Sequence, residues 1–174
     1  MNQNKYLIVV DMQNDFIDGS LGTAEAQAIV PAAAERIRVA AREGWNVIAT
    51  LDTHEENYLD TAEGRKLPVR HCIRGTEGWR LAAPIKAALG DATLVEKPTF
   101  GSVRLPGMIE DGDGLVIELI GLCTDICVVS NALLLKAHFP EADIRVNSAC
   151  CAGVTPEKHR AALETMASCQ IGIV

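Results

Sequence analysis

An aspartate, a lysine and a cysteine of this sequence each come after a run of apolar residues. Asp11 and Lys97 directly follow such runs, and Cys127 lies shortly beyond a third one. A thiol becomes a strong nucleophile when a nearby base takes its proton and a nearby cation stabilises the thiolate. The three residues therefore predict covalent catalysis in which Cys127 attacks a carbonyl, Asp11 is the base and Lys97 supports the negative charge.

The segment around Cys127 is typical of a turn between a buried strand and a helix, which we expect over residues 125–138. Thr124 is a suitable N-cap, so Cys127 would lie in the first turn of the helix. Helix N-termini lower a thiol pKa below its usual ~8.5, and their free N–H groups can bind an oxyanion. Cys123 is the rival nucleophile, and a small buried cysteine is the alternative interpretation of Cys127.

A second cluster of possible ligands follows another predicted strand. Asp52 and His54 form an Asp-x-His pair, His71 lies in the irregular segment 53–77, and Glu63 lies between them in the sequence. Both side chains of an Asp-x-His pair at a strand end can face one cation, and this set of oxygen and nitrogen donors suits zinc, iron or manganese. Such a pair also commonly serves only to cap a turn.

The elements that must position these residues alternate along the chain. Short apolar runs predict six strands, at residues 6–10, 46–51, 92–96, 115–120, 144–146 and 171–174. Helical spacing predicts helices at residues 29–43, 78–89, 125–138 and 156–168. Continuous apolar strands that alternate with helices predict an α/β fold. We expect a single-domain, Rossmann-like three-layer sandwich with a central, mainly parallel six-stranded sheet.

Ligands of open parallel sheets bind beyond the carboxyl ends of the strands. Asp11, Asp52, Lys97 and the 123–127 segment all come at or just after predicted strand ends. We therefore expect these residues to meet at one rim of the sheet.

Composition narrows the class of protein. The chain has 174 residues, of which 48% are hydrophobic and 22% are charged, and its net charge is −7. This length is enough for one domain with its own core. The negative charge and the lack of any basic run argue against nucleic-acid binding. The longest apolar stretch, residues 115–120, is too short to span a bilayer.

The six cysteines form no Cys-x-x-Cys pair, which argues against a zinc ribbon or a thioredoxin-type site. With no apolar leader at the N-terminus, they predict free thiols in a reducing compartment, and we expect a cytoplasmic protein. Cys150, Cys151 and Cys169 are expected to be small buried hydrophobes near a strand end. The adjacent pair should point to opposite faces of the sheet.

Three motifs, taken together, resemble the isochorismatase-like cysteine hydrolases, and within them the nicotinamidases. They are Val-Val-Asp-Met-Gln-Asn-Asp-Phe around Asp11, Glu-Lys-Pro-Thr-Phe-Gly-Ser around Lys97, and Gly-Leu-Cys-Thr-Asp-Ile-Cys-Val, which ends just after Cys127. The resemblance extends over the whole chain and implies one isochorismatase-like hydrolase domain at residues 1–174. It implies hydrolysis of a small amide through a thioester, with nicotinamide as the best match and NAD salvage as the setting.

The resemblance also implies a role for each residue. Asp11 would pass the thiol proton to the leaving amine, and Lys97 would hold Asp11 and Cys127 in register. The backbone N–H groups of Cys123 and Cys127 would form the oxyanion hole, next to a cis peptide bond between Leu122 and Cys123. Ammonia would leave first, and water would then hydrolyse the thioester.

A divalent metal is implied as well, zinc first, with iron or manganese as alternatives. Its ligands would be Asp52, His54, Glu63 and His71, and it would hold the pyridine nitrogen of the substrate. Two phenylalanines match the aromatic residues of the pocket, namely Phe16 and Phe100.

One position departs from the family pattern. Pro68 stands three residues before His71, where nicotinamidases usually carry an aromatic residue. Arg70, beside this position, could instead meet a carboxylate or another polar substrate.

Several functions stay open at this point. The first is a nicotinamidase-like amidase that holds a metal. The second is a related cysteine hydrolase, with or without metal, that acts on a ureido, carbamoyl or other small amide. A non-catalytic binding protein and a redox protein that pairs Cys127 with Cys123 are the others. We expect a small-molecule amide substrate, no nucleic-acid or membrane partner, and a homo-oligomer.

Overall fold

A computed structural model describes residues 4–174 of the chain. Six strands form one sheet in the order β3-β2-β1-β4-β5-β6, and every neighbouring pair is parallel. The strands are β1 (Lys5–Val10), β2 (Asn46–Asp52), β3 (Thr93–Lys97), β4 (Val116–Leu122), β5 (Asp143–Ala152) and β6 (Gly172–Ile173). The predicted α/β fold is confirmed, and the sheet is wholly parallel.

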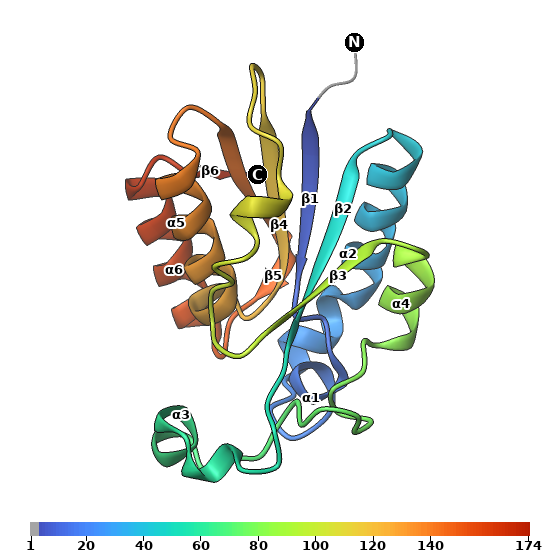
Figure 1. Ribbon diagram of the computed structural model, residues 1–174, viewed down its shortest axis with the longest axis vertical. Helices are drawn as coiled ribbons and strands as arrows, with labels where there is room; N and C mark the ends of the chain where they lie inside the picture. The colour runs from blue at the N-terminus through green and yellow to red at the C-terminus, as the bar shows by residue number, and fades with distance from the viewer. Residues whose placement is uncertain (1–3) are drawn as a thin grey trace.

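Helices cover both faces of the sheet, so the molecule has three layers (Figure 1). One face packs against α1 (Asn14–Ile17), α2 (Ala24–Arg42) and α4 (Ala83–Leu89), and the other against α5 (Val129–His138) and α6 (Pro156–Ser168). Successive residues of β1 enter alternate cores: Leu7 joins the α2 side and Ile8 joins the α5 side. Because this central strand is buried on both faces, it is apolar at every position from Leu7 to Val10.

Short helical segments lie at the carboxyl rim and in the connections. They are η1 (Tyr58–Asp60), α3 (Ala62–Lys66), η2 (Pro106–Met108) and a π-helical turn, η3 (Thr124–Val128). Figure 1 shows α3 standing beyond the end of β2, away from the two helical layers. Segment 53–77 was expected to be irregular, so η1 and α3 correct that prediction. No helix among residues 4–174 is long and apolar enough to cross a membrane.

Several predicted element boundaries were wrong. Helix α2 begins at Ala24 and not at residue 29, because Thr23 caps it by accepting a hydrogen bond from the N–H of Ala26. Helix α4 begins only at Ala83 and not at residue 78. The expected helix 125–138 is divided into η3 and α5.

Strand β5 runs from Asp143 to Ala152 rather than over 144–146. A register shift between Leu119 and Gly121 of β4 lets β5 rejoin its neighbour at Cys151. The polar residues before that point hid the continuation from the apolar pattern.

The cysteine predictions held for two residues and failed for one. Cys150 and Cys151 are both buried, and they belong to the cores on opposite faces of the sheet. Cys169 is exposed, contrary to the prediction, because α6 ends at Ser168 and Cys169 lies in the turn that leads to β6.

Candidate active site

Strand register brings the predicted catalytic residues to one rim. Asp52 and Lys97 are paired neighbours on β2 and β3. Val10, the last residue of β1, pairs with Gly121 of β4, so Asp11 lies beside the turn that leads to Cys127. The predicted convergence at the carboxyl ends of the strands is therefore present.

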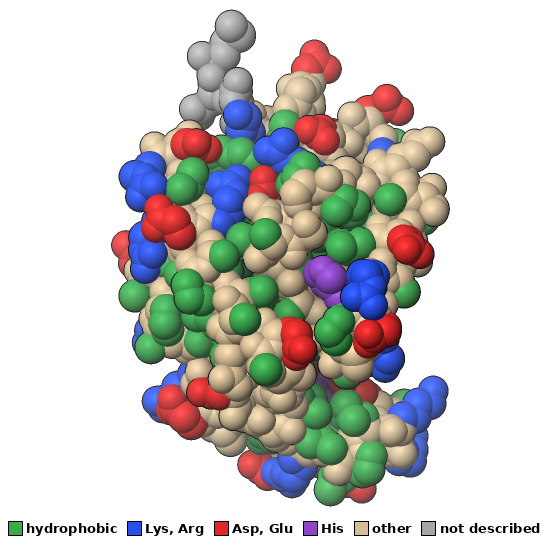
Figure 2. Space-filling view, turned by 180° about the vertical axis from the view of Figure 1, so that it is seen from behind, with side chains coloured by type: hydrophobic (Ala, Val, Ile, Leu, Met, Phe, Trp, Pro, Cys, Tyr) green, Lys and Arg blue, Asp and Glu red, His purple; other side chains and the backbone are tan. Residues whose placement is uncertain are grey.

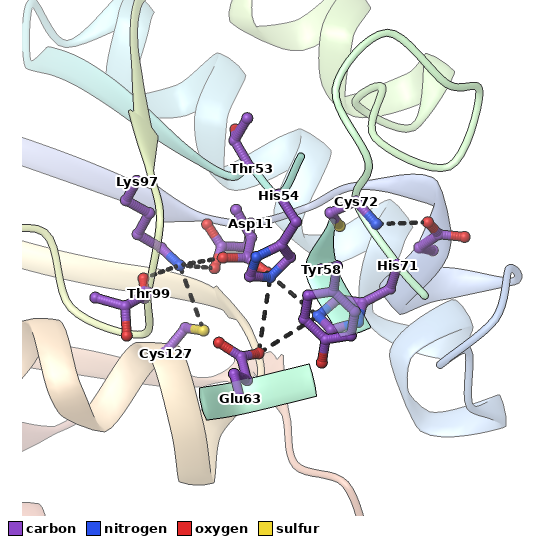
Figure 3. Close-up of polar contacts among 12 residues, drawn as sticks. Asp11, Thr53, His54, Tyr58, Glu63, His71, Cys72, Lys97, Thr99 and Cys127 are labelled. Carbon is purple, nitrogen blue, oxygen red and sulfur yellow. Dashed lines mark hydrogen bonds and ion pairs between the residues drawn. The ribbon is translucent and has the colours of Figure 1, made fainter. Parts of the chain in front are cut away.

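A single buried ammonium connects these residues (Figure 3). Lys97 is only 1% exposed, and its Nζ lies 2.6 Å from Asp11 Oδ2, 3.5 Å from Cys127 Sγ and 3.4 Å from Asp52 Oδ1. Nζ also donates a hydrogen bond to the carbonyl of Thr99, at 3.0 Å. Burial opposes the charge of Lys97, but Asp11 and the neighbouring acids raise its pKa above the ordinary value, so the side chain stays a cation.

Asp11 is held in an unusual backbone conformation. Its φ is +48°, in the left-handed region that non-glycine residues seldom adopt and that is concentrated at functional sites. Its N–H donates to the carbonyl of Thr50, and the Thr50 hydroxyl donates to Asp11 Oδ1, at 2.7 Å. Sequence reasoning missed Thr50, although a threonine two residues before Asp52 must share a face of β2 with it.

The ionisation of Asp11 suits a base. Burial raises the pKa of its carboxyl, and the charge of Lys97 only partly offsets this effect. A raised pKa brings a carboxylate closer to the working pH, where a base is most effective. Asp11 Oδ2 lies 2.6 Å from the Lys97 ammonium, so a proton that binds this oxygen competes with that ion pair.

Cys127 lies in the π-helical turn rather than in the first turn of an α-helix. The N–H groups of Ile126 and Val128 both donate to the carbonyl of Cys123. Thr124 is not the N-cap that the sequence predicted, because its hydroxyl is hydrogen-bonded to Nδ1 of His159, at 2.8 Å. The peptide bond before Cys123 is cis, as the family resemblance implied. Short π-helical turns within helices are frequent at functional sites.

The predicted lowering of the Cys127 pKa was wrong. Burial and the charge of Asp11 raise the pKa of the thiol well above its ordinary value, and Lys97 only partly offsets them. The prediction weighed the helix terminus and the cation but not the cost of placing a thiolate in a dry interior. A thiol in these surroundings stays protonated unless a neighbouring base takes its proton.

The predicted metal ligands also meet. One donor atom from each of Asp52, His54 and His71 lies within 4.8 Å of the other two, and all three residues are buried. His54 Nε2 is 3.0 Å and His71 Nε2 is 3.5 Å from Asp52 Oδ2. Tetrahedral sites with bonds of about 2.0–2.1 Å place their donors about 3.3 Å apart, so the spacing fits a metal ion such as zinc.

Glu63 comes to the same place from α3 (Figure 3). Its Oε1 lies 3.7 Å from Nε2 of both His54 and His71. Burial and the charge of Asp52 raise the pKa of the Glu63 carboxyl. A carboxylate that lies close to another carboxylate and to two imidazole nitrogens is suited to bind a cation together with these groups.

Three buried contacts hold these ligands in place. His71 Nδ1 is 2.8 Å from the carbonyl of Val69, which fixes that nitrogen as the donor and leaves Nε2 for the cluster. The Gln13 amide accepts a hydrogen bond from the Asp52 N–H and donates one to the Asp52 carbonyl. The Tyr58 ring packs against the rings of His54 and His71, with centroids 4.6 and 5.0 Å apart.

Sequence reasoning missed Gln13 and Tyr58. Gln13 stands inside the first motif, two residues after Asp11, so a polar residue near a buried aspartate was the available signal. Tyr58 gave no signal, because its irregular segment shows no period.

A pocket of about 40 Å³ joins the two clusters. Its walls combine the nucleophile, three of the acid and imidazole ligands and several apolar side chains: Phe16, Leu21, Asp52, Glu63, Leu67, His71, Phe100, Cys123, Ile126 and Cys127. Phe16 is buried, with its ring centroid 5.6 Å from that of His71, whereas Phe100 is 41% exposed. The expected role of Arg70 is not supported, because it forms an ion pair with Glu56 and does not line this pocket.

Replacing one imidazole tests the metal cluster. We expect His54→Ala to weaken zinc binding by more than about 100-fold, because losing even a supporting partner of a metal ligand costs 10–100-fold. Competition with a chromophoric chelator measures the affinity. His138→Ala is the matched control, since that histidine packs against Phe139 on α5 and not against the cluster. Unchanged metal affinity in His54→Ala would exclude this site.

Comparisons with known proteins agree with this geometry. The sequence model of the Isochorismatase domain matches residues 5–174. The nicotinamidase/pyrazinamidase of Mycobacterium tuberculosis is 27% identical over 183 residues, which span 97% of each chain. Nicotinamidase 1 of Arabidopsis thaliana is 30% identical over 171 residues, which span 84% of this chain and 68% of that protein. The crystal structure of the pyrazinamidase of Pyrococcus horikoshii in complex with zinc has a TM-score of 0.85 at 31% identity and 98% coverage of both chains.

Proposed function

Because this chain belongs to the isochorismatase family, we propose that it is a cysteine amidohydrolase that converts nicotinamide to nicotinate and ammonia. The observation that carries the proposal is the position of Lys97, whose ammonium contacts Asp11, Cys127 and Asp52 at once. One cation thus joins a base and a nucleophile to the cluster of metal ligands. Such an enzyme recycles a breakdown product of pyridine nucleotides.

The proposed reaction begins with proton transfer. Asp11 accepts the thiol proton of Cys127 as the sulfur attacks the amide carbonyl, and Lys97 stabilises the developing thiolate. The backbone N–H groups of Cys123 and Cys127 accommodate the oxyanion. Asp11 then gives the proton to the leaving nitrogen, and ammonia departs from a thioester.

Hydrolysis of the thioester completes the cycle. Water attacks the acyl carbon while Asp11 takes one of its protons. The carbon–sulfur bond breaks, the proton returns to Cys127, and the carboxylic acid is released. Each turn of the cycle consumes one amide and one water and leaves the three residues in their starting states.

The proposed metal ligands are Asp52, His54, Glu63 and His71, whose oxygen and nitrogen donors suit zinc, with iron or manganese as alternatives. When bound, the metal supplies a coordination site for the pyridine nitrogen and so orients the substrate. Phe16 and Phe100 then face the ring from the pocket walls.

The charges of the site favour a substrate without a carboxylate. Lys97 is already paired with Asp11 and Asp52, and among residues 4–174 no arginine or lysine lines the pocket. Apart from the proposed metal, a carboxylate would therefore meet no unpaired cation of the pocket wall and would lie beside acidic side chains. This argues for nicotinamide over ureido or carbamoyl acids.

Entry of a ring requires the pocket to widen. Its 40 Å³ is far below the 300–1,000 Å³ that is typical of ligand sites. Glu63 on α3 and the neighbouring Leu67 line the pocket, and α3 packs on neither face of the sheet (Figure 1). We expect α3 to move outward when substrate enters and to close over it afterwards.

Ammonia release from nicotinamide tests the proposal. We expect the zinc-loaded protein to hydrolyse nicotinamide, and treatment with a chelator to raise KM strongly because the ring nitrogen loses its anchor. An N-carbamoyl amino acid is the matched comparison, since it offers a scissile carbon–nitrogen bond and a carboxylate. Hydrolysis of the carbamoyl substrate alone would replace nicotinamide by that class.

A further inference from the structure

Asn131 is a fully buried polar residue on α5, four positions after Cys127. Its Nδ2 donates to the carbonyl of Cys127 at 2.8 Å and to the carbonyl of Phe100 at 3.2 Å. Its Oδ1 accepts a hydrogen bond from the N–H of Ser102 at 2.9 Å. One amide therefore joins the turn that carries the nucleophile to the segment that carries a wall of the pocket.

The Phe100 segment depends on such contacts for its position. It follows β3 and runs across to α5 without regular hydrogen-bonded structure (Figure 1). At Gly101 the segment lies close to α5, since a Cβ at that position would be in ordinary van der Waals contact with Cβ of Ser130, at 3.5 Å. The Phe100 ring is 41% exposed, so packing of the ring contributes little to fixing it.

Asparagine is the residue type that these three partners require. Its side chain offers two N–H donors and one acceptor, which match two carbonyls and one N–H group. Aspartate would turn a carboxylate toward two carbonyls, and an apolar residue would leave buried backbone groups unpaired. The amide also spans the gap between α5 and the segment, which a shorter hydroxyl could not do.

We propose that Asn131 is a positioning residue that sets the place of the Phe100 wall relative to the Cys127 sulfur and thereby governs substrate binding. The proposal rests on the proposed function, in which Phe100 faces the bound ring. Lys97 also donates a hydrogen bond to the carbonyl of Thr99. The segment is therefore hydrogen-bonded to Lys97 as well as to Asn131. Asn131 contacts neither the Cys127 sulfur nor the substrate. We therefore expect its replacement to change KM rather than kcat.

The test uses Asn131→Ser, whose hydroxyl can still bond to the helix carbonyl four residues earlier but cannot reach the segment. We expect KM for nicotinamide to rise about tenfold, which corresponds to the ~1.4 kcal/mol of one to two lost buried hydrogen bonds. We expect kcat to stay within about threefold, because Asp11, Lys97 and Cys127 are unchanged. A second variant, Asn131→Asp, keeps an oxygen that can accept the N–H of Ser102 but lacks the N–H donors for the carbonyls of Cys127 and Phe100.

Phe100→Ala completes a double-mutant cycle. If Asn131 acts through the wall, adding Asn131→Ser to Phe100→Ala raises KM no further. The matched control is Asn4→Ser, because Asn4 also donates to a backbone carbonyl, that of Glu110, at the opposite end of β1. An unchanged KM in a folded Asn131→Ser protein, or additive effects of the two substitutions, would overturn the proposal.

A measurement without turnover separates this proposal from the proposed function. 3-(Bromoacetyl)pyridine carries the pyridine ring that Phe100 is proposed to face and alkylates thiols, and mass spectrometry follows its reaction at Cys127 alone. We expect Asn131→Ser to raise the concentration that half-saturates this reaction. Failure of the unaltered protein to hydrolyse nicotinamide would remove the proposed function. An identical dependence on the concentration of 3-(bromoacetyl)pyridine in both proteins would remove the role of Asn131.

Discussion

Replacing Cys127 by alanine lowers kcat by about 10⁴-fold or more, the loss expected when a covalent nucleophile is removed. We expect nicotinamide still to bind, because the proposed metal ligands and the phenylalanines of the pocket remain. The substitution replaces one small buried side chain by another, so we expect the fold to tolerate it. Ammonia release measures the rate, and calorimetry measures the binding of nicotinamide to the zinc-loaded variant.

Cys123→Ala is the matched control for this prediction. Cys123 lines the same pocket, and burial raises the pKa of its thiol to about 12. Its proposed part in the reaction is its backbone N–H, which alanine keeps, so we expect activity within a few-fold of the unaltered protein. Loss of activity in Cys123→Ala with retention in Cys127→Ala would reverse the two roles.

The sequence predicted the site best where the parallel sheet dictates position. Asp52 and Lys97 end their strands, and Asp11 directly follows β1. Parallel strands present their carboxyl ends at one rim, which is why the three residues were expected to lie close together. Phe16 and Phe100 also line the pocket, as the resemblance implied. The central strands β1, β2 and β4 were found because strands that are buried on both faces are largely apolar.

The local errors came from contacts that no sequence window contains. The N-cap expected of Thr124 failed because His159, 35 residues later, binds its hydroxyl. The prediction of a lowered Cys127 pKa failed because burial and the charge of Asp11 outweigh the effect of Lys97. The predicted β5 was too short because polar residues follow its apolar start. These residues continue the strand only because of the register shift in β4, which the sequence does not reveal.

The supporting residues were the hardest to predict. Thr50, Gln13 and Tyr58 act through bonds to Asp11, Asp52 and Leu67, which are 9 to 39 residues away. Each is a common residue type in an ordinary position of its own segment. The contribution of each residue depends on a partner that only the folded chain brings near. The site is therefore determined by the tertiary structure as well as by the sequence motifs.

Replacing the base is the second large effect. We expect Asp11→Asn to lower kcat/KM by about 10²–10⁴-fold, the usual contribution of a positioned general base. Asparagine has the same shape and is among the residues that best tolerate a positive φ, so the backbone at +48° can persist. Lys97 keeps Asp52 and Thr99 as partners, which limits the cost to the fold.

The pH dependence identifies the group that is lost. Asp11 acts as a carboxylate and its pKa is raised, so activity should fall as the pH drops through a value above the ordinary carboxyl range. Asp11→Asn should lack this acid limb. Thr50→Val removes the hydroxyl that lowers the pKa of Asp11 and should move the limb to higher pH with little change in the maximal rate. A limb that stays in place in Thr50→Val and persists in Asp11→Asn would belong to another group, and Asp11 would not be the base.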